Sequence, residues 1–331
     1  MRTPKKTIIA SIMTATLAVA ALTGCDAVGQ KVTGVLDRIP FLSDSSTAST
    51  DSRDSTDASS ILTPDKHQAV DDSVLITPGT LTVGVNPNVS GVPLSCVEDG
   101  KLVGMDIDLG SALADDMGLK VKCVVVDGTA ESLGTACDVV MDQAQDPNGA
   151  YKLSDVYGQS AVAVFHKGDM GVAKVEDLSS KNVAVQTGSV PESTLDQTGL
   201  TVNKKGYSTL NDAFADLDKG AVDFVLCDVY AGAYLAHVYD DIYFAGTLNA
   251  PTDAGVACAN DNSVLSSAVA ESLGNIKGNG VFDLLRSRWL GDLPVLDATT
   301  QIQNVPAKAE PAAPAEGDAV AQPADAAQPA A

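Results

Sequence analysis

The chain has 331 residues, of which 19% are charged and only 4% aromatic, and its formal net charge is −22 at pH 7. A surface this acidic repels phosphate backbones and anionic lipid headgroups, which argues against nucleic-acid binding and against polybasic membrane contact. The length is sufficient for one large or two smaller α/β cores.

The first 25 residues predict a lipoprotein signal peptide. A basic start (Arg2, Lys5, Lys6) precedes an apolar stretch over residues 7–22, which is short for a transmembrane helix and typical of a signal-peptide core. The sequence Leu-Thr-Gly-Cys that ends at Cys25 resembles the bacterial lipobox. We therefore expect Cys25 to carry lipid, palmitate included, and to hold the protein on the extracytoplasmic face of the cell membrane. The alternative is an ordinary secretory signal with a chance cysteine.

Both flanks of the presumed globular part have a biased composition. Residues 26–76 are rich in Ser, Thr, Ala and Asp, and we expect them to form a disordered tether of roughly 40 Å root-mean-square span. Residues 297–331 are dominated by Ala, Pro and acidic residues, and we expect a disordered tail.

The cysteines and histidines do not form a recognisable metal or redox motif. The chain has six cysteines and three histidines, with no CxxC spacing. We therefore expect no metal and no cofactor. Lipidation of Cys25 leaves an odd number of thiols, and a disulfide, if one forms, is expected first among Cys96, Cys123 and Cys137.

Between these flanks, short strand-like runs alternate with helical patterns, which predicts βαβ units, largely parallel sheets and an α/β fold. The expected strands are 81–85, 121–126, 139–141, 161–165, 183–186, 222–226, 242–245 and 255–259. The expected helices are 105–117, 191–196, 210–219, 229–238, 264–276 and 281–289.

One long segment resembles a known family. It reads GTLTVGVNPN, VPLSCVEDGKLVGMDIDLGSALADDMGLKVKCVVVD, LSDVYGQSAVAVFHKG, NVAVQTGSVPES, DAFADLDKGAVDFVLCDVYAGAYL and GVACANDNSVLSSAVAESLGNIKGNGVFDLLRSRWLG in order. This order, over residues 80–291, is similar to that of the bacterial solute-binding proteins of polar-amino-acid ABC transporters, which have the type II periplasmic-binding-protein fold.

The resemblance implies two α/β lobes joined by two crossover strands. Lobe 1 would comprise residues 77–165 and 248–296, and lobe 2 residues 166–247, with crossings near 164–166 and 247–249. The resemblance also implies a monomer that traps a small solute by hinge closure. A membrane ABC permease would then recognise the closed form.

Asp228 is the strongest candidate for a ligand contact. It directly follows an expected strand, where ligands of βα folds gather. It matches the family's aspartate that holds the α-ammonium group of the substrate. The alternative is an N-cap for the helix that starts at Val229, and both roles can coexist because a cap uses one oxygen.

The turn Thr187-Gly188-Ser189 also follows a strand and opens a helix. Its free N–H groups and the helix dipole favour an anion, and Gly188 permits close backbone approach. The resemblance assigns this turn to the substrate carboxylate, although any capped helix has the same local pattern. Ser189 and Glu192 have capping-box spacing.

Two further positions come from the resemblance alone. Asn86 matches a polar contact of the family. Leu94 stands where the family usually has Phe on the apolar wall of the pocket, and Val89 stands where the family has another aromatic residue. Loop packing is the alternative for Val89 and Leu94.

The segment after the third strand departs from the family. The family normally has an Arg there that grips the α-carboxylate, whereas residues 142–151 contain no Arg and two acids, Asp142 and Asp146. With Asp142 and Asp228 both near the cleft, we hypothesise a cationic or amine-bearing solute. The alternative is that Asp142 and Asp146 are solvated loop charges.

Two other functions stay open at this point. A few members of the fold are enzymes, such as dehydratases, and Asp142 and Asp228 would then be the acid–base candidates. A ligand-free surface or scaffold protein is the other possibility, because the gripping Arg is missing.

Overall fold

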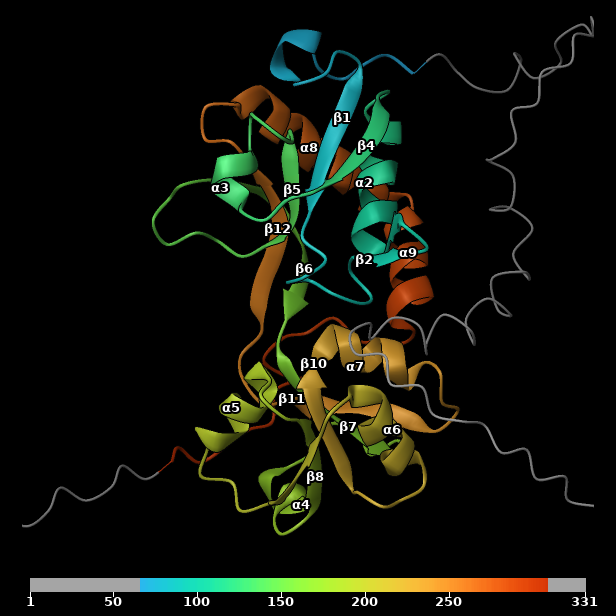
Figure 1. Ribbon diagram of the computed structural model, residues 1–331, viewed down its shortest axis with the longest axis vertical. Coiled ribbons are helices and arrows are strands. Elements are labelled where there is room, and N and C mark those ends of the chain that lie inside the picture. Colours follow the sequence, from blue (N-terminus) through green and yellow to red (C-terminus); the bar gives the residue numbers. More distant parts are fainter. Residues whose placement is uncertain (1–65, 309–331) are drawn as a thin grey trace, which may run out of the picture. The chain divides into compact units, whose positions relative to one another are not determined.

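A computed structural model describes residues 66–308 (Figure 1). The predicted signal peptide, Cys25, most of the predicted tether and the last part of the tail lie outside the described residues. Within residues 66–308, no helix combines the length and apolar character needed to cross a bilayer.

The first lobe is built on a five-stranded sheet with strand order β4-β1-β5-β12-β6. Its strands are β1 (Thr80–Val85), β4 (Lys120–Val125), β5 (Val139–Gln143), β6 (Lys152–Ser160) and β12 (Thr252–Cys258). Its other elements are η2 (Asp72–Val74), the hairpin β2 (Cys96–Glu98) and β3 (Lys101–Val103), α2 (Met105–Asp116), α3 (Thr129–Ser132), α8 (Ser263–Gly278) and α9 (Val281–Leu290). Leu109 and Leu113 of α2, one turn apart, are fully buried, which is the periodicity that predicted this helix.

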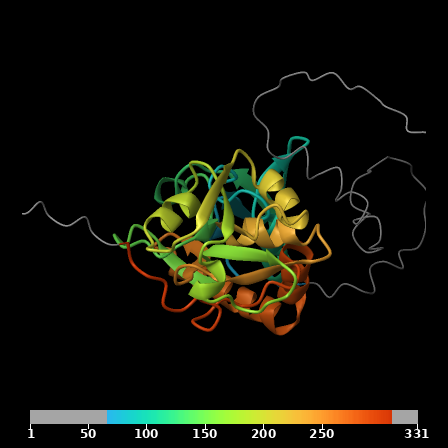
Figure 2. The ribbon, with the colours of Figure 1, turned by 90° about the horizontal axis from the view of Figure 1, so that it is seen from below.

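The second lobe is built on a sheet with strand order β11-β7-β10-β8-β9. Its strands are β7 (Val162–Lys167), β8 (Asn182–Gln186), β9 (Asn203–Tyr207), β10 (Phe224–Asp228) and β11 (Ile242–Thr247). Its helices are α4 (Val175–Leu178), α5 (Val190–Asp196), α6 (Leu210–Asp218) and α7 (Val229–Ala236). Figure 2 shows this lobe, yellow-green to gold, in front.

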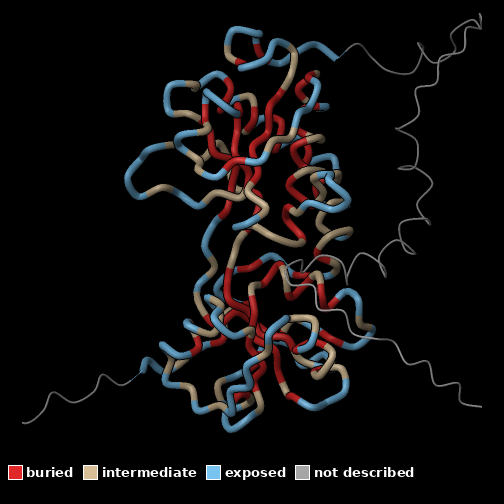
Figure 3. Tube along the Cα trace, in the orientation of Figure 1, coloured by how far each residue is buried: buried red, intermediate tan, exposed pale blue. Residues whose placement is uncertain are grey.

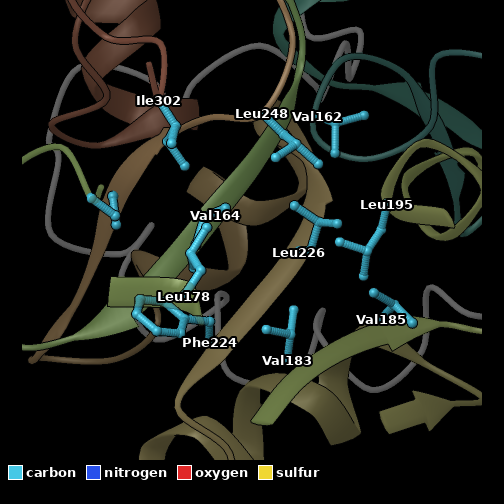
Figure 4. Close-up of a cluster of buried hydrophobic side chains, with 12 residues drawn as sticks. Val162, Val164, Leu178, Val183, Val185, Leu195, Phe224, Leu226, Leu248 and Ile302 are labelled. Atoms are coloured by element: carbon cyan, nitrogen blue, oxygen red, sulfur yellow. The ribbon is translucent and has the colours of Figure 1, made fainter. Parts of the chain in front are cut away.

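Buried residues concentrate in the strands of both sheets, and exposed residues in the surrounding turns (Figure 3). The core of the second lobe contains Val164 of β7, Val185 of β8 and Leu226 of β10, all 1% exposed or less. Figure 4 shows these side chains converging on one another. Such burial of β-branched and leucine side chains stabilises each lobe around its own sheet.

The chain crosses from the first sheet to the second at Ala161, between β6 and β7, and returns between Thr247 and Thr252. The first crossing is a few residues earlier than the expected 164–166, because β7 pairs with β10 from Val162 onward. The run of apolar residues predicted a strand at β7, but it did not predict that this strand belongs to the second sheet.

The expectation of largely parallel sheets is wrong. β1 is parallel to β4 and β5, and β8 is parallel to β9 and β10, but the remaining two pairings in each sheet are antiparallel. The crossover connections explain this pattern. β6 and β11 leave their sheets at the end where the parallel strands finish, and β7 and β12 enter the opposite sheets at that same end.

A third crossing was not expected. Residues 292–308, which we call the strap, leave α9 in the first lobe and attach to the second. Ile302 lies in the second core with 1% exposure, and Thr247 N donates to Thr300 O at 2.9 Å. Gly199 N donates to Pro306 O at 2.6 Å. The part of the predicted tail from 297 to 308 is therefore ordered, and Figure 1 shows it in red beside β11.

Two other expectations differ from the structure. The last residues of the predicted tether fold onto the first lobe, where Val70 and Leu75 are buried and Ile76 N donates to Asp138 Oδ1 at 2.8 Å. Cys123 and Cys137 are free thiols, so the three candidate cysteines form no disulfide among themselves.

Candidate functional site

A pocket of about 230 Å³ lies where the crossover segments meet the second lobe. Its lining residues come from β6, the two crossovers, β12, α5 and the end of β10: Ser160, Ala161, Val162, Val190, Pro191, Thr194, Asp228, Asn249 and Thr252. Because both lobes contribute, a solute held here contacts the parts of the chain that a hinge motion would displace.

Asp228 ends β10 and caps α7, as both of its proposed roles required. Its Oδ1 accepts hydrogen bonds from the amides of Tyr230 at 2.9 Å and Ala231 at 3.1 Å. Its Oδ2 accepts from Ser160 Oγ at 3.3 Å, next to the pocket. Burial raises the pKa of Asp228, and these hydrogen bonds partly oppose the rise.

Asp142 lies in β5, in the first lobe, with a left-handed backbone (φ 55°). Its amide donates to the Tyr157 hydroxyl at 2.8 Å, and its half-buried carboxylate accepts a hydrogen bond from Ser90. Burial raises the pKa of Asp142 to about 6, and the charge of Asp228 adds to the rise. Non-glycine residues in this conformation are uncommon and concentrate at functional sites.

The end of β6 contacts both aspartates, Asp142 through its backbone amide and Asp228 through its carboxylate. The Tyr157 hydroxyl donates to Asp106 Oδ1 at 2.6 Å and accepts from the Asp142 amide. Three residues later, the Ser160 hydroxyl donates to Asp228 Oδ2. Between them, Gln159 N donates to the Tyr230 hydroxyl at 2.7 Å. The nine-residue strand thus contacts the backbone amide of Asp142 in one lobe and the carboxylate of Asp228 at the edge of the other.

Neither carboxylate has a cationic partner. No ion pair within residues 66–308 includes Asp142 or Asp228. The Arg286 charge acts on Tyr230, but its guanidinium donates to the Leu293 carbonyl at 2.9 Å. The two carboxylates therefore carry uncompensated negative charge.

The turn 187–189 has its amides engaged within the chain. Thr187 N donates to Tyr207 O at 2.9 Å, Ser189 N to Gln186 O at 3.3 Å, and Gly188 N to Glu192 Oε2 at 2.7 Å. Ser189 Oγ accepts from Glu192 N at 3.2 Å, which is one half of the capping box expected from the spacing. The Glu192 carboxylate accepts from Gly188 N and not from the N-cap amide of Ser189, so the second half does not form. Assignment of a solute carboxylate to this turn stays a prediction.

Asn86 and Leu94 are placed by local contacts. Asn86 ends β1, where its Oδ1 accepts from Asn88 N at 3.2 Å and its Nδ2 donates to Asp127 O at 3.4 Å. Leu94 is only 5% exposed, whereas Val89 is 80% exposed. Their roles in binding stay predictions.

A comparison with protein families shows to which family the chain belongs. Residues 81–292 match the profile of the bacterial extracellular solute-binding proteins, family 3. The chain belongs to this family. It is accordingly a solute-binding protein and not an enzyme.

Several relatives and solved structures are similar to this solute-binding protein. The L-cystine-binding protein TcyJ of Escherichia coli K12 is 29% identical over 223 residues, which cover 64% of this chain and 83% of the relative. The arginine-binding periplasmic protein of Mannheimia haemolytica is 26% identical over 207 residues, covering 59% and 84% of the two chains.

Solved structures confirm the two-lobed α/β fold. An ancestral cationic amino acid solute-binding protein is similar with 26% identity and a TM-score of 0.55, over 64% of this chain and 96% of that one. A polar amino acid uptake protein from Streptococcus thermophilus has 20% identity and a TM-score of 0.59, over 67% and 89%.

Sequence reasoning missed the residues that connect the two aspartates. Tyr157 and Ser160 lie on β6, whose polar sequence has no strand-like alternation, and Tyr230 lies in an apolar helix. No group of three His, Cys, Asp or Glu residues within the described part is arranged to hold a metal ion.

Proposed function

We propose that this protein is the lipid-anchored, extracytoplasmic receptor of an ABC importer and that it captures a small amine-bearing solute. The observation that carries the proposal is the pair Asp142 and Asp228. One comes from each lobe, both are contacted by β6, and neither forms an ion pair with a described residue. An ammonium or guanidinium group supplies the missing charge and donates hydrogen bonds to both.

The names of similar proteins support this chemistry. The relatives described above are named for cystine and arginine, and the solved structure for cationic amino acids, all of which carry amino groups. In this proposal Asp228 holds one amino group and Asp142 approaches from the other lobe. Asn86, Leu94 and the turn Thr187-Gly188-Ser189 complete the walls.

Attachment and transport are the remaining parts of the proposal. Cys25 carries the lipid, the segment before residue 66 reaches from the membrane to the first lobe, and the monomer delivers its solute to a membrane permease. Metabolic labelling with a palmitate analogue tests the anchor. Label and membrane fractionation are expected for the natural chain and are expected to be lost in Cys25→Ala.

A thermal-shift screen of amino acids, amines and short peptides tests the binding. We expect amine-bearing solutes to raise the melting temperature, and expect Asp228→Asn to abolish the shift. Asp241→Asn, which removes an equally negative but exposed side chain of the second lobe, is the matched control. A screen without any response would favour a scaffold, and a response to neutral solutes alone would contradict the amine assignment.

A further inference from the structure

The candidate site contains two carboxylates, Asp142 and Asp228, that lack a cationic partner. It offers few groups that could bind an anion. The first lobe lacks the Arg that its relatives' family normally has there, since residues 142–151 contain no cation. Lys152 is next in sequence but starts β6 opposite Cys258, whereas the pocket residue Ser160 ends that strand opposite Thr252. It therefore lies at the far end of the strand.

The second lobe has filled its own anion site. Glu192 Oε2 accepts from Gly188 N, and Lys204 holds the same carboxylate at 3.1 Å while also pairing with Asp196 at 2.8 Å. A solute carboxylate arriving at this turn would meet a carboxylate already bound there. Pro191 removes a further amide from the first turn of α5, which leaves Val190 N as the first-turn amide without a partner among the described residues.

Charge balance then distinguishes solutes of different classes. An amino acid with a neutral side chain brings one positive and one negative group, so the charge enclosed with Asp142 and Asp228 is unchanged. A molecule with two cationic groups and no carboxylate neutralises both aspartates. In a site that closes and excludes water, unpaired charge is strongly unfavourable, so this difference becomes a difference in affinity.

The lining of the pocket fits one end of such a molecule. Val162, Val190 and Pro191 line the pocket together with the polar residues Asp228 and Asn249, whereas Asp142 is not among its lining residues. A short methylene chain suits the apolar part of this lining, and the volume of about 230 Å³ restricts the part of the solute held at Asp228 to a small group. The second cationic group would extend beyond this pocket toward Asp142.

We infer that the solute is a small organic dication without a carboxylate group, such as an α,ω-diamine or a guanidinoalkylamine, with one cationic end at Asp228 and the other at Asp142. This inference rests on the proposed function and narrows its substrate class. Glu192 acts against carboxylate-bearing solutes by occupying the Gly188 amide.

Matched pairs of ligands test the inference directly. Ornithine and 1,4-diaminobutane, lysine and 1,5-diaminopentane, and arginine and agmatine differ within each pair only by a carboxylate group. Calorimetric titration of the full-length protein is expected to show at least about tenfold tighter binding of the carboxylate-free member in one pair, which corresponds to about 1.4 kcal/mol. Tighter binding of the amino acid in every pair that binds would overturn the inference while leaving the proposed function intact.

Two variants locate the effect. Asp142→Asn is expected to weaken the preferred diamine at least tenfold, whereas Asp241→Asn leaves it unchanged. Glu192→Gln is expected to reduce the preference for the diamine by improving binding of the amino acid partner. A preference that survives Asp142→Asn in full would overturn the placement of the second cation. If no amine of either type binds and a neutral solute does, the proposed function itself fails.

Discussion

The two lobes present their aspartates in different ways. In the second lobe, Asp228 is fixed by the amides of α7, and the adjacent turn is closed by Glu192. In the first lobe, Asp142 has a left-handed backbone, and Ser90 is the group that donates to its carboxylate. The Asp228 carboxylate is thus held in position before a solute binds. The Asp142 carboxylate has no cation paired with it among the described residues. Solute binding is therefore expected to depend on both aspartates. Removal of the Asp142 charge is expected to stabilise the protein without solute, whereas removal of the Asp228 charge is expected to change its stability little.

The strap is expected to give the largest effect on stability. Ile302→Ala removes a side chain that is 1% exposed in the second core, and buried truncations of this kind lower the free energy of unfolding by about 2–5 kcal/mol. Urea denaturation measures the loss. Leu284→Ala, on an exposed face of α9, is the matched control and is expected to change stability by less than about 0.5 kcal/mol. Equal effects of the two would show that the strap does not stabilise the second lobe.

Asp228→Asn is expected to have the next largest effect, and on affinity. Loss of a charge-assisted contact weakens solute binding by about 100-fold or about 2.7 kcal/mol. Since asparagine is also a good N-cap, the free energy of unfolding is expected to change by less than about 1 kcal/mol. Calorimetry and denaturation of the same sample separate the two. A large loss of stability with unchanged affinity would make Asp228 a cap alone.

Asp142→Asn is expected to stabilise the protein without solute. The folded pKa of about 6 lies above the ordinary value of 3.8, so the unfolded chain releases this proton first. The free energy of unfolding consequently falls as pH rises from about 4 to about 6 and stays lower above that range. Removal of the charge is expected to add about 1–3 kcal/mol at about pH 7.5 and little at about pH 3.

The backbone permits this substitution, because asparagine tolerates the left-handed conformation. Thermal unfolding of the variant, with Asp241→Asn as control, gives the measurement at both pH values. A destabilised Asp142→Asn at neutral pH would show that the carboxylate is already compensated and would contradict the contrast between the lobes.

The pH dependence of binding is expected to be the smallest effect. The groups around Asp142 are Ser90, Asp106, Tyr157, Asp228 and Tyr230, and a cationic solute favours the ionised aspartate. The affinity for a cationic solute is therefore expected to fall as the pH drops below about 6, by up to tenfold for each pH unit. Titration between about pH 5 and 8 measures this, and affinity that is constant in the natural chain would exclude ionised Asp142 from binding.

Local patterns in the sequence predicted the secondary structure of the core better than its connections. The apolar runs of β1, β8 and α8 were found within a few residues, since period and composition there agree with burial. β6 and β9 were missed because their residues are largely polar and their strand conformation comes from pairing with neighbours. The strap was missed because its buried apolar residues, Leu293, Leu296 and Ile302, follow neither a helical nor a strand period.

The same limit applies to the site. The strand end predicted Asp228, and the missing family Arg drew attention to Asp142; the part of each in binding stays a prediction. Their contacts with β6 join Asp142 to Tyr157, 15 positions apart, and Asp228 to Ser160, 68 positions apart, which no local pattern reveals. The engagement of Gly188 by Glu192 was visible only as a capping box, not as an occupied anion site.

The central claim is that the two aspartates, one from each lobe, hold a single solute. A crystal structure of the protein with its tightest-binding amine tests this most directly. The account predicts cationic nitrogens of the solute within about 3 Å of both the Asp142 and the Asp228 carboxylates. A solute bound with Asp142 turned to solvent, or with a carboxylate seated on the Gly188 amide in place of Glu192, would contradict it.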